Sequence, residues 1–186
     1  PMQEIMPEFS NLMSSALSID PNDFECHRLQ CAVNTMMGDM KAALEHGKKA
    51  YDVNPNDPRI LQQYGEVLLK TGKTEEGCDL TLLALEYDPI AQGQTNSDKR
   101  KSDGVFGCVL DDRPQVGLDI ASTMIERSEK VLVYSAALAV SSTGSLESYS
   151  WLIDDLKDAN FEKIEEAIEE MGKFDVVVQS KLKEVF

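Results

Sequence analysis

The chain has 186 residues and a formal net charge of −15 at neutral pH, because 33 Asp and Glu outnumber 18 Lys and Arg. This excess of negative charge repels phosphate backbones, so we expect no nucleic-acid partner and expect any charge-steered protein partner to be basic. The longest apolar stretches are interrupted by polar residues and are too short to cross a bilayer, so we also expect no membrane partner.

The first predicted element is a helix over residues 3–20. Phe9, Leu12, Met13, Ala16 and Leu17 place apolar side chains at helical spacing along this segment. A stripe of this kind is typical of an amphipathic helix that packs one face against a neighbour.

A 34-residue period begins at the end of this helix. Pro21, Pro55 and Pro89 stand 34 residues apart, and each follows Asp or Asn. Self-similarity at such a step indicates a stack of repeated units. The same step relates further small residues, namely Ala16, Ala50 and Ala84, and Gly38 and Gly72.

Each period contains the signals of two helices. A residue before Pro is disfavoured in a helix, so each Pro closes a unit, while Gly72 supplies the positive φ that a tight turn between helices requires. These signals predict helices at 24–37 and 39–53 in the first full unit, and at 58–71 and 73–87 in the second.

Leu61, Tyr64, Gly65 and Leu68 follow a large, large, small, large pattern on the first helix of the second unit. This pattern and the 34-residue length resemble the tetratricopeptide repeat (TPR) family. The resemblance implies an all-α fold, a right-handed αα-superhelix of antiparallel helix pairs, over the single domain 1–186. Within it, 3–20 is a half repeat and 22–55 and 56–89 are repeats. Because the half repeat has no first helix, we expect the chain to be part of a larger protein.

The period weakens after Pro89. Residues 90–98 are polar and predict a loop. Two degenerate repeats follow at 99–127 and 128–159, and C-terminal capping helices occupy 160–186. The helices expected here are 99–111, 114–127, 128–142, 145–159, 161–172 and a last helix from Asp175, although the run from Val176 to Val178 leaves a strand open.

The TPR resemblance also implies a protein-binding groove lined by the first helix of each pair. Carried over by position, the groove residues are Glu25, Arg28, Leu29, Ala32, Thr35 and Met36, and then Arg59, Gln62, Gln63, Glu66, Leu69 and Lys70. A carboxylate clamp of the chaperone-binding type is not expected, because Ala32, Gln62 and Glu66 replace the family's basic and amide residues. In the helix 24–37, an alternative is a rotated helix that uses Cys26, Leu29, Val33 and Met36 as its inner stripe.

Little in the sequence indicates catalysis. The only histidines are His27 and His46, and the four cysteines show no CxxC spacing, which indicates reduced thiols in the cytoplasm. Cys26, His27 and Cys31 leave a metal site as an alternative, but these three lack the fourth ligand of a zinc site. We therefore expect no enzyme activity, no cofactor and no metal.

The sequence thus predicts a non-catalytic scaffold that binds a peptide or helix of a partner protein. Two alternatives remain at this stage. One is homo-oligomerisation, with a homodimer formed through Trp151, Phe161, Phe174 and Phe186. The other is a regulatory role, because the C-terminal half has a weaker similarity to the TPR tails of bacterial regulators and nucleotide cyclases.

Overall fold

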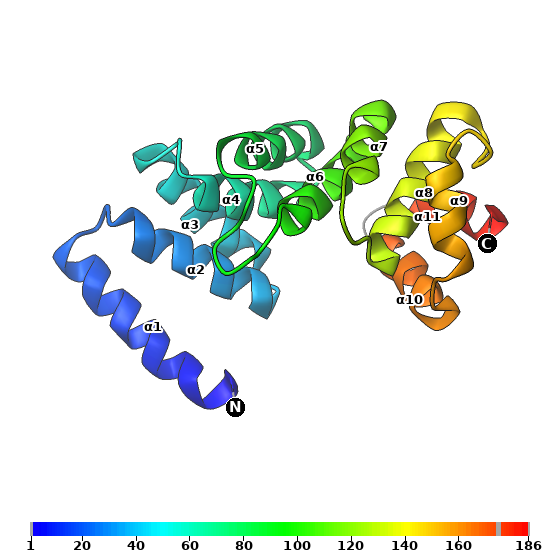
Figure 1. Cartoon of the computed structure of the whole chain (residues 1–186). Helices are drawn as coiled ribbons and strands as arrows, with labels where there is room; N and C mark the ends of the chain where they lie inside the picture. Colours follow the sequence, from blue (N-terminus) through cyan, green and yellow to red (C-terminus); the bar gives the residue numbers. More distant parts are fainter. Residues whose placement is uncertain (1, 174–175, 186) are drawn as a thin grey trace.

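The computed structural model describes residues 2–173 and 176–185, and within these ranges it is built from α-helices and contains no strand (Figure 1). The helices are α1 (Met2–Ile19), α2 (Phe24–Met37), α3 (Met40–Val53), α4 (Pro58–Lys70), α5 (Thr74–Tyr87), α6 (Asp98–Leu110), α7 (Pro114–Ser122), α8 (Glu129–Thr143), α9 (Ser150–Lys157), α10 (Phe161–Met171) and α11 (Val176–Val185).

The helices of the two periodic units begin and end where their sequence signals predict. Asp23 and Asp39 cap α2 and α3, since their carboxylates accept hydrogen bonds from the backbone N–H of Cys26 (2.7 Å) and Ala42 (3.0 Å). Such caps satisfy backbone donors that have no partner inside the helix. Gly72 has a φ of +82° after α4, so the tight turn predicted there is confirmed.

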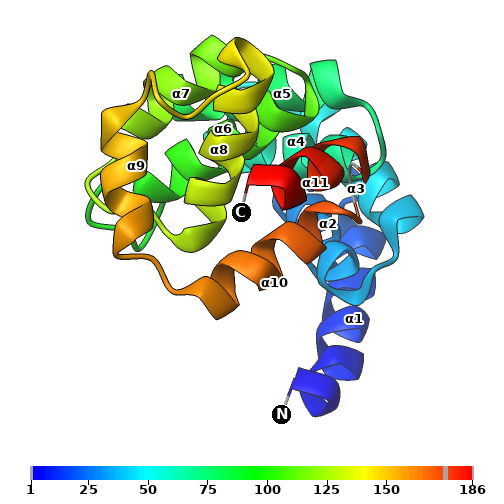
Figure 2. The same ribbon diagram turned by 90° about the vertical axis from the view of Figure 1, so that its right-hand side faces the viewer.

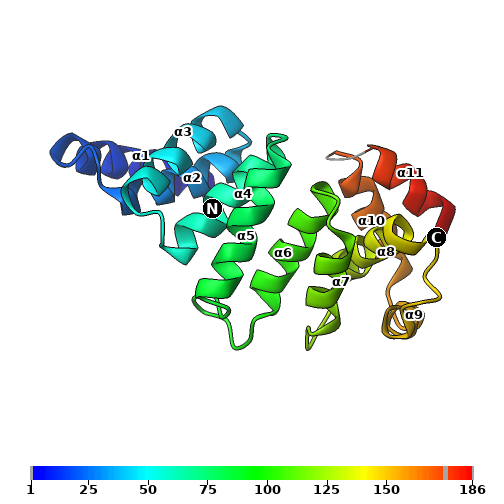
Figure 3. The same ribbon diagram turned by 90° about the horizontal axis from the view of Figure 1, so that it is seen from above.

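From α1 to α9, and again from α10 to α11, neighbouring helices along the chain pack against each other, and α4, α5, α6 and α7 follow one another across the molecule in chain order (Figure 3). Helices α2, α4, α6 and α8, which we call the first layer, contact one another in that order. Helices α3, α5 and α7 lie outside this layer, and each touches the first-layer helices that precede and follow it. Helix α1 packs against α2 and extends away from the remaining helices (Figure 1).

Helices α4 and α5, the second unit of the 34-residue period, pack closely against each other. Leu61, Leu68 and Ala84 are completely buried there. The backbones of the two helices approach closely at Gly65 and Gly77, because a Cβ atom added to Gly77 would lie 2.8 Å from the carbonyl oxygen of Gly65. The large and small positions of the repeat pattern therefore match the core.

Helix α8 is the centre of the C-terminal half. Its residues Val131 to Ala139 are all buried, and it contacts α6, α7, α9, α10 and α11 (Figure 2). The run is apolar apart from Tyr134 and Ser135, as expected for a helix that is covered on most sides.

Two predicted helices in this half are shorter than expected. Helix α7 ends at Ser122 rather than at residue 127, because the next segment turns back to the start of α6: the backbone N–H groups of Ile125 and Glu126 donate to the carboxylate of Asp98 at 3.2 and 2.8 Å. Helix α9 begins at Ser150 rather than at residue 145, because the hydroxyl of Thr143 donates to the Ser145 carbonyl (2.8 Å) and holds a turn. Local side-chain bonds of this kind compete with helix formation.

At the C-terminus, Val176 begins a helix, so the strand alternative for this run is wrong. The predicted start of that helix at Asp175 lies outside the described residues.

Helix α2 buries residues of both predicted faces. His27 and Cys31, from the face that the repeat alignment indicates, are buried, and so is Cys26 of the alternative stripe. Leu29 and Val33 of that stripe are half-buried and Met36 is 68% exposed, so the rotated helix stays a prediction.

Candidate functional site

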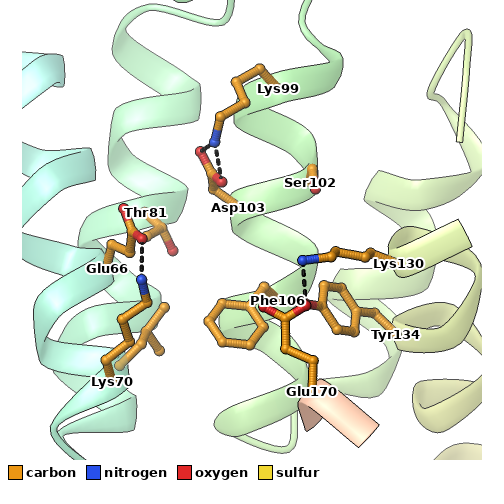
Figure 4. A pocket seen from close by; sticks show the side chains of 11 residues that line it. Glu66, Lys70, Thr81, Lys99, Ser102, Asp103, Phe106, Lys130, Tyr134 and Glu170 are labelled. Carbon is orange, nitrogen blue, oxygen red and sulfur yellow. Dashed lines mark hydrogen bonds and ion pairs between the residues drawn. The ribbon is translucent and has the colours of Figure 1, made fainter. Parts of the chain in front are cut away.

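A pocket of about 260 Å³ opens between first-layer helices and α10 (Figure 4). Charged side chains surround it, and two aromatic rings, a leucine and two hydroxyl groups complete its lining. The lining residues are Glu66, Leu69 and Lys70 from α4, Thr81 from α5, Lys99, Ser102, Asp103 and Phe106 from α6, Lys130 and Tyr134 from α8, and Glu170 from α10.

The six charged side chains form three ion pairs around the pocket (Figure 4). The Lys70 ammonium lies 2.6 Å from the Glu66 carboxylate, one helical turn away. Lys99 lies 2.5 Å from Asp103, again at a spacing of four residues. The third pair joins Lys130 of α8 to Glu170 of α10 and so crosses between helices that are far apart in sequence.

Phe106 and Tyr134 place two aromatic rings side by side in the pocket, with centroids 5.3 Å apart and planes tilted by 37°. Tyr134 is almost fully buried, and burial raises the pKa of its hydroxyl to about 12, with further contributions from the carboxylates of Glu170 and Asp103. The tyrosine is therefore neutral, and its hydroxyl lies in the negative field of two carboxylates.

Asp103 is held by a network behind the pocket. Its carboxylate accepts hydrogen bonds from Lys99 and from the side-chain amide of Gln62, and the Gln62 carbonyl in turn accepts from Arg100. Burial raises the pKa of Asp103, and the nearby Glu66 carboxylate raises it further, while Lys99 and Gln62 act in the opposite direction.

Arg100 fixes the position of that network. Its side chain is 2% exposed, and its guanidinium also donates to the backbone carbonyls of Asp88 (2.9 Å) and Pro58 (3.2 Å) and pairs with the Asp88 carboxylate (3.2 Å). It thus joins the start of α4 to the end of α5. Five donors in a rigid fork suit arginine to such a junction.

The predicted groove residues of α4 divide into two groups. Glu66, Leu69 and Lys70 line the pocket, although Leu69 is almost fully buried and also packs in the core. Gln62 does not offer its amide to a ligand, because both ends of that amide are already bonded to Arg100 and Asp103.

The remaining predicted residues of the second unit, Gln63 and Arg59, do not belong to the lining that the structure describes. Arg59 pairs with Asp57 (2.6 Å) and with Glu25 of α2 (3.4 Å). It therefore links α2 to the start of α4.

The predicted groove residues of α2 lie away from this pocket. Arg28 pairs with Glu25 at 2.5 Å, and the hydroxyl of Thr35 donates to the backbone carbonyl of Cys31 at 2.8 Å. Met36 is exposed at the end of the helix. The two remaining predicted residues, Leu29 and Ala32, are half-buried.

His27 and His46 form a hydrogen bond between α2 and α3, with their Nδ1 atoms 2.9 Å apart. The Nε2 atom of His27 lies 3.0 Å from the carbonyl oxygen of Pro21, so this nitrogen donates to that oxygen. Burial lowers the pKa of His46, and His27 lowers it further. Among the residues that the structure describes, no three His, Cys, Asp or Glu side chains lie together as a metal-binding group, so the metal alternative at Cys26 gains no support.

The four cysteines are buried and unpaired by disulfides. Burial raises the pKa of the Cys31 thiol to about 12, which makes its thiolate inaccessible near neutral pH.

Most of the pocket was missed by reasoning from the sequence. The contributions of α6, α8 and α10 lie beyond residue 89, where the 34-residue period fails and positions could not be carried over from the TPR family. The sequence signal for this part of the pocket is the basic run from Lys99 to Lys101. In the structure these three side chains lie on one helix and bind three different partners: Asp103, Asp88 and Thr123.

No known family model matches the sequence, and no curated protein matches it closely enough to count as a relative. The similarity to TPR proteins therefore remains a prediction. In the described part of the chain, no helix has both the length and the apolar character that crossing a membrane requires.

Proposed function

We propose that the chain is a TPR-like superhelical scaffold without catalytic activity, and that it binds an extended segment or helix of a partner protein across its first layer. The observation that supports this proposal most strongly is the pocket, because it combines partly buried charges with two aromatic rings on the layer that the resemblance assigns to binding. Pockets of this composition hold anchoring side chains at protein interfaces.

Three features of the pocket suit a protein partner. Its lining comes from five helices, α4, α5, α6, α8 and α10, so the arrangement depends on the folded stack. Its ion pairs can exchange one partner for a charged group of a ligand. The scaffold also offers fixed helices on which these groups stand, which limits the entropy lost on binding.

The test begins with a random peptide library, from which binders of the full chain are selected. The affinity of a selected peptide is then compared between the unaltered chain and the double variant Glu66→Lys with Lys70→Glu. This exchange preserves the net charge and the ion pair but reverses the charge pattern in the pocket. We expect at least a tenfold loss of affinity.

A matched control is available on α3. Lys48 and Asp52 form an exposed ion pair at the same four-residue spacing, with 2.7 Å between the charged atoms. The exchange Lys48→Asp with Asp52→Lys should leave the affinity unchanged. Equal losses in both double variants, or no loss in either, would refute binding at the pocket.

Homo-oligomerisation remains a second candidate because of one observation at the C-terminal end. Phe161 is 71% exposed, and Val176 on the adjacent helix α11 is 66% exposed. Of the other predicted members of that surface, Trp151 instead packs against the core with Arg127 4.8 Å above its ring, and Phe174 and Phe186 lie outside the described residues. Light scattering of the chain and of Phe161→Ser distinguishes the cases, since a dimer through this face requires the mass to halve in the variant.

A further inference from the structure

We propose that the pocket recognises the guanidinium group of an arginine side chain, which lies against Phe106 and Tyr134 and between the carboxylates of Asp103 and Glu170. This inference rests on the proposed function for its biological meaning, since the arginine would belong to the partner segment. The binding chemistry itself can be measured with a small probe.

The two lysines opposite these carboxylates mark where a cation binds. Lys99 lies 2.5 Å from Asp103, and Lys130 pairs with Glu170, so an ammonium group already stands beside each carboxylate. Both lysines reach these positions on long flexible side chains, and exposed pairs of this kind are weak. An incoming cation can therefore replace them.

The exposure of the two pairs indicates which members are fixed. The side chain of Lys99 is 51% exposed and that of Asp103 25%, while Lys130 is 54% exposed and Glu170 38%. The carboxylates thus lie deeper than the lysines, and Asp103 is also held by Gln62. When the lysines turn outward to solvent, the carboxylates remain in the pocket.

The aromatic rings favour guanidinium over ammonium. Guanidinium is planar, is weakly hydrated and stacks on aromatic faces, and it donates several hydrogen bonds in one plane to neighbouring carboxylates. Phe106 and Tyr134 provide two ring surfaces beside Glu170 (Figure 4). Tyr134 and Ser102, which also line the pocket, add hydroxyl oxygens as hydrogen-bond acceptors.

The pocket lining holds three acidic and three basic side chains, so a carboxylate becomes available to a second cation when its lysine turns outward. The carboxylates of Glu170 and Asp103 act on the Tyr134 hydroxyl, since both add to the rise that burial causes in the pKa of that hydroxyl. The net charge of −15 adds long-range attraction for a basic segment. An anionic ligand would meet these carboxylates, and the third pair, Glu66 with Lys70, need not open for the arginine to enter.

The experiment is an NMR titration of the full chain with N-acetyl-arginine-N-methylamide. Blocked citrulline has the same shape without the charge, blocked lysine has the charge without the planar fork, and blocked glutamate has the opposite charge. We expect saturable shifts centred on Phe106 and Tyr134 for arginine, with a dissociation constant at least fivefold lower than for lysine or citrulline, and no saturable shift for glutamate.

Three variants locate the site. Asp103→Asn and Glu170→Gln should each weaken arginine binding at least fivefold. Glu166→Gln, on the exposed face of the same helix α10, removes the same charge outside the pocket and should leave the binding unchanged. Circular dichroism spectra establish that each variant retains its helices.

The inference is overturned if citrulline binds as tightly as arginine, if the shifts centre elsewhere, or if Glu166→Gln weakens binding as much as Glu170→Gln. Its failure is separable from that of the scaffold. Selected peptides that bind at the pocket without any arginine contradict the inference and leave the proposed function intact, whereas arginine binding without any peptide binder contradicts the proposed function alone.

Discussion

Replacing Gln62 by Ala tests whether this residue supports the site from behind rather than contacting a ligand. Its amide joins the buried guanidinium of Arg100 to the carboxylate of Asp103. The substitution removes both hydrogen bonds at once. Gln63 is the matched control, because it is the next residue of the same helix, is equally half-buried and takes no part in this network.

The expected loss of stability follows from what each partner retains. A hydrogen bond to a charged group contributes about 1.5–3 kcal/mol. Arg100 keeps its bonds to the carbonyls of Asp88 and Pro58, and Asp103 keeps Lys99 and some contact with water, so both losses fall at the low end of that range. Alanine is also a slightly better helix former than glutamine. Two losses of about 1.5 kcal/mol, less a few tenths for the better helix former, give an expected net loss of about 2.5 kcal/mol in the free energy of unfolding.

The assay is urea unfolding followed by circular dichroism. Gln62→Ala should lower the urea midpoint without changing the slope. Its melting temperature should fall by about 5–10 °C, at about 2–4 °C per kcal/mol for a chain of this size. Gln63→Ala should change the free energy of unfolding by at most about 0.5 kcal/mol. Equal effects of the two substitutions would refute the assignment of Gln62 to the supporting network.

Three further outcomes are expected. Gly77→Ala should destabilise the chain by about 1–3 kcal/mol, since the added Cβ would lie 2.8 Å from the backbone of Gly65. The Cβ of Gly104→Ala meets no atom closer than 3.4 Å, so this variant should be neutral or stabilising by up to about 1 kcal/mol. Thermal melting of both variants checks this, and similar melting points would contradict it. Ala84→Leu should overpack the interface of α4 with α5 and cost about 1–3 kcal/mol in urea unfolding, and an unchanged midpoint would mean that the packing is wrong. The pKa of the Asp103 carboxyl is raised above its ordinary value of 3.8, so the folded chain binds the proton of this carboxyl more tightly than the unfolded chain does. The unaltered chain should therefore lose stability relative to Asp103→Asn as the pH rises above about 4. A difference in stability between the two chains that does not change with pH would contradict the raised pKa.

The helices were predicted well where the residues that start and end them act locally. Asp-Pro and Asn-Pro pairs, capping aspartates and Gly72 act within a few residues, and they place the ends of α2, α3, α4 and α5. The predictions were poorer where a helix end depends on a distant partner. The early end of α7 requires Asp98, which is 27 residues from Ile125 in sequence, and no local pattern encodes that contact.

The site was less predictable than the fold for a related physical reason. Glu66 and Lys70 were predicted from their position in the repeat, and they line the pocket. Gln62 was predicted on the same grounds, but its side-chain carbonyl accepts a hydrogen bond from Arg100, 38 residues away. Whether a polar side chain is free for a ligand depends on its tertiary partners. Tyr134 and Glu170 reach the pocket through the packing of α8 and α10, which follows no repeat.

The most direct test of the binding proposal is an NMR map of a library-selected peptide on the full chain. The proposal predicts that the largest shifts fall on the pocket residues of α4, α6, α8 and α10, including Phe106 and Tyr134. Largest shifts on the outer helices α3, α5 and α7, with the pocket unaffected, would contradict it.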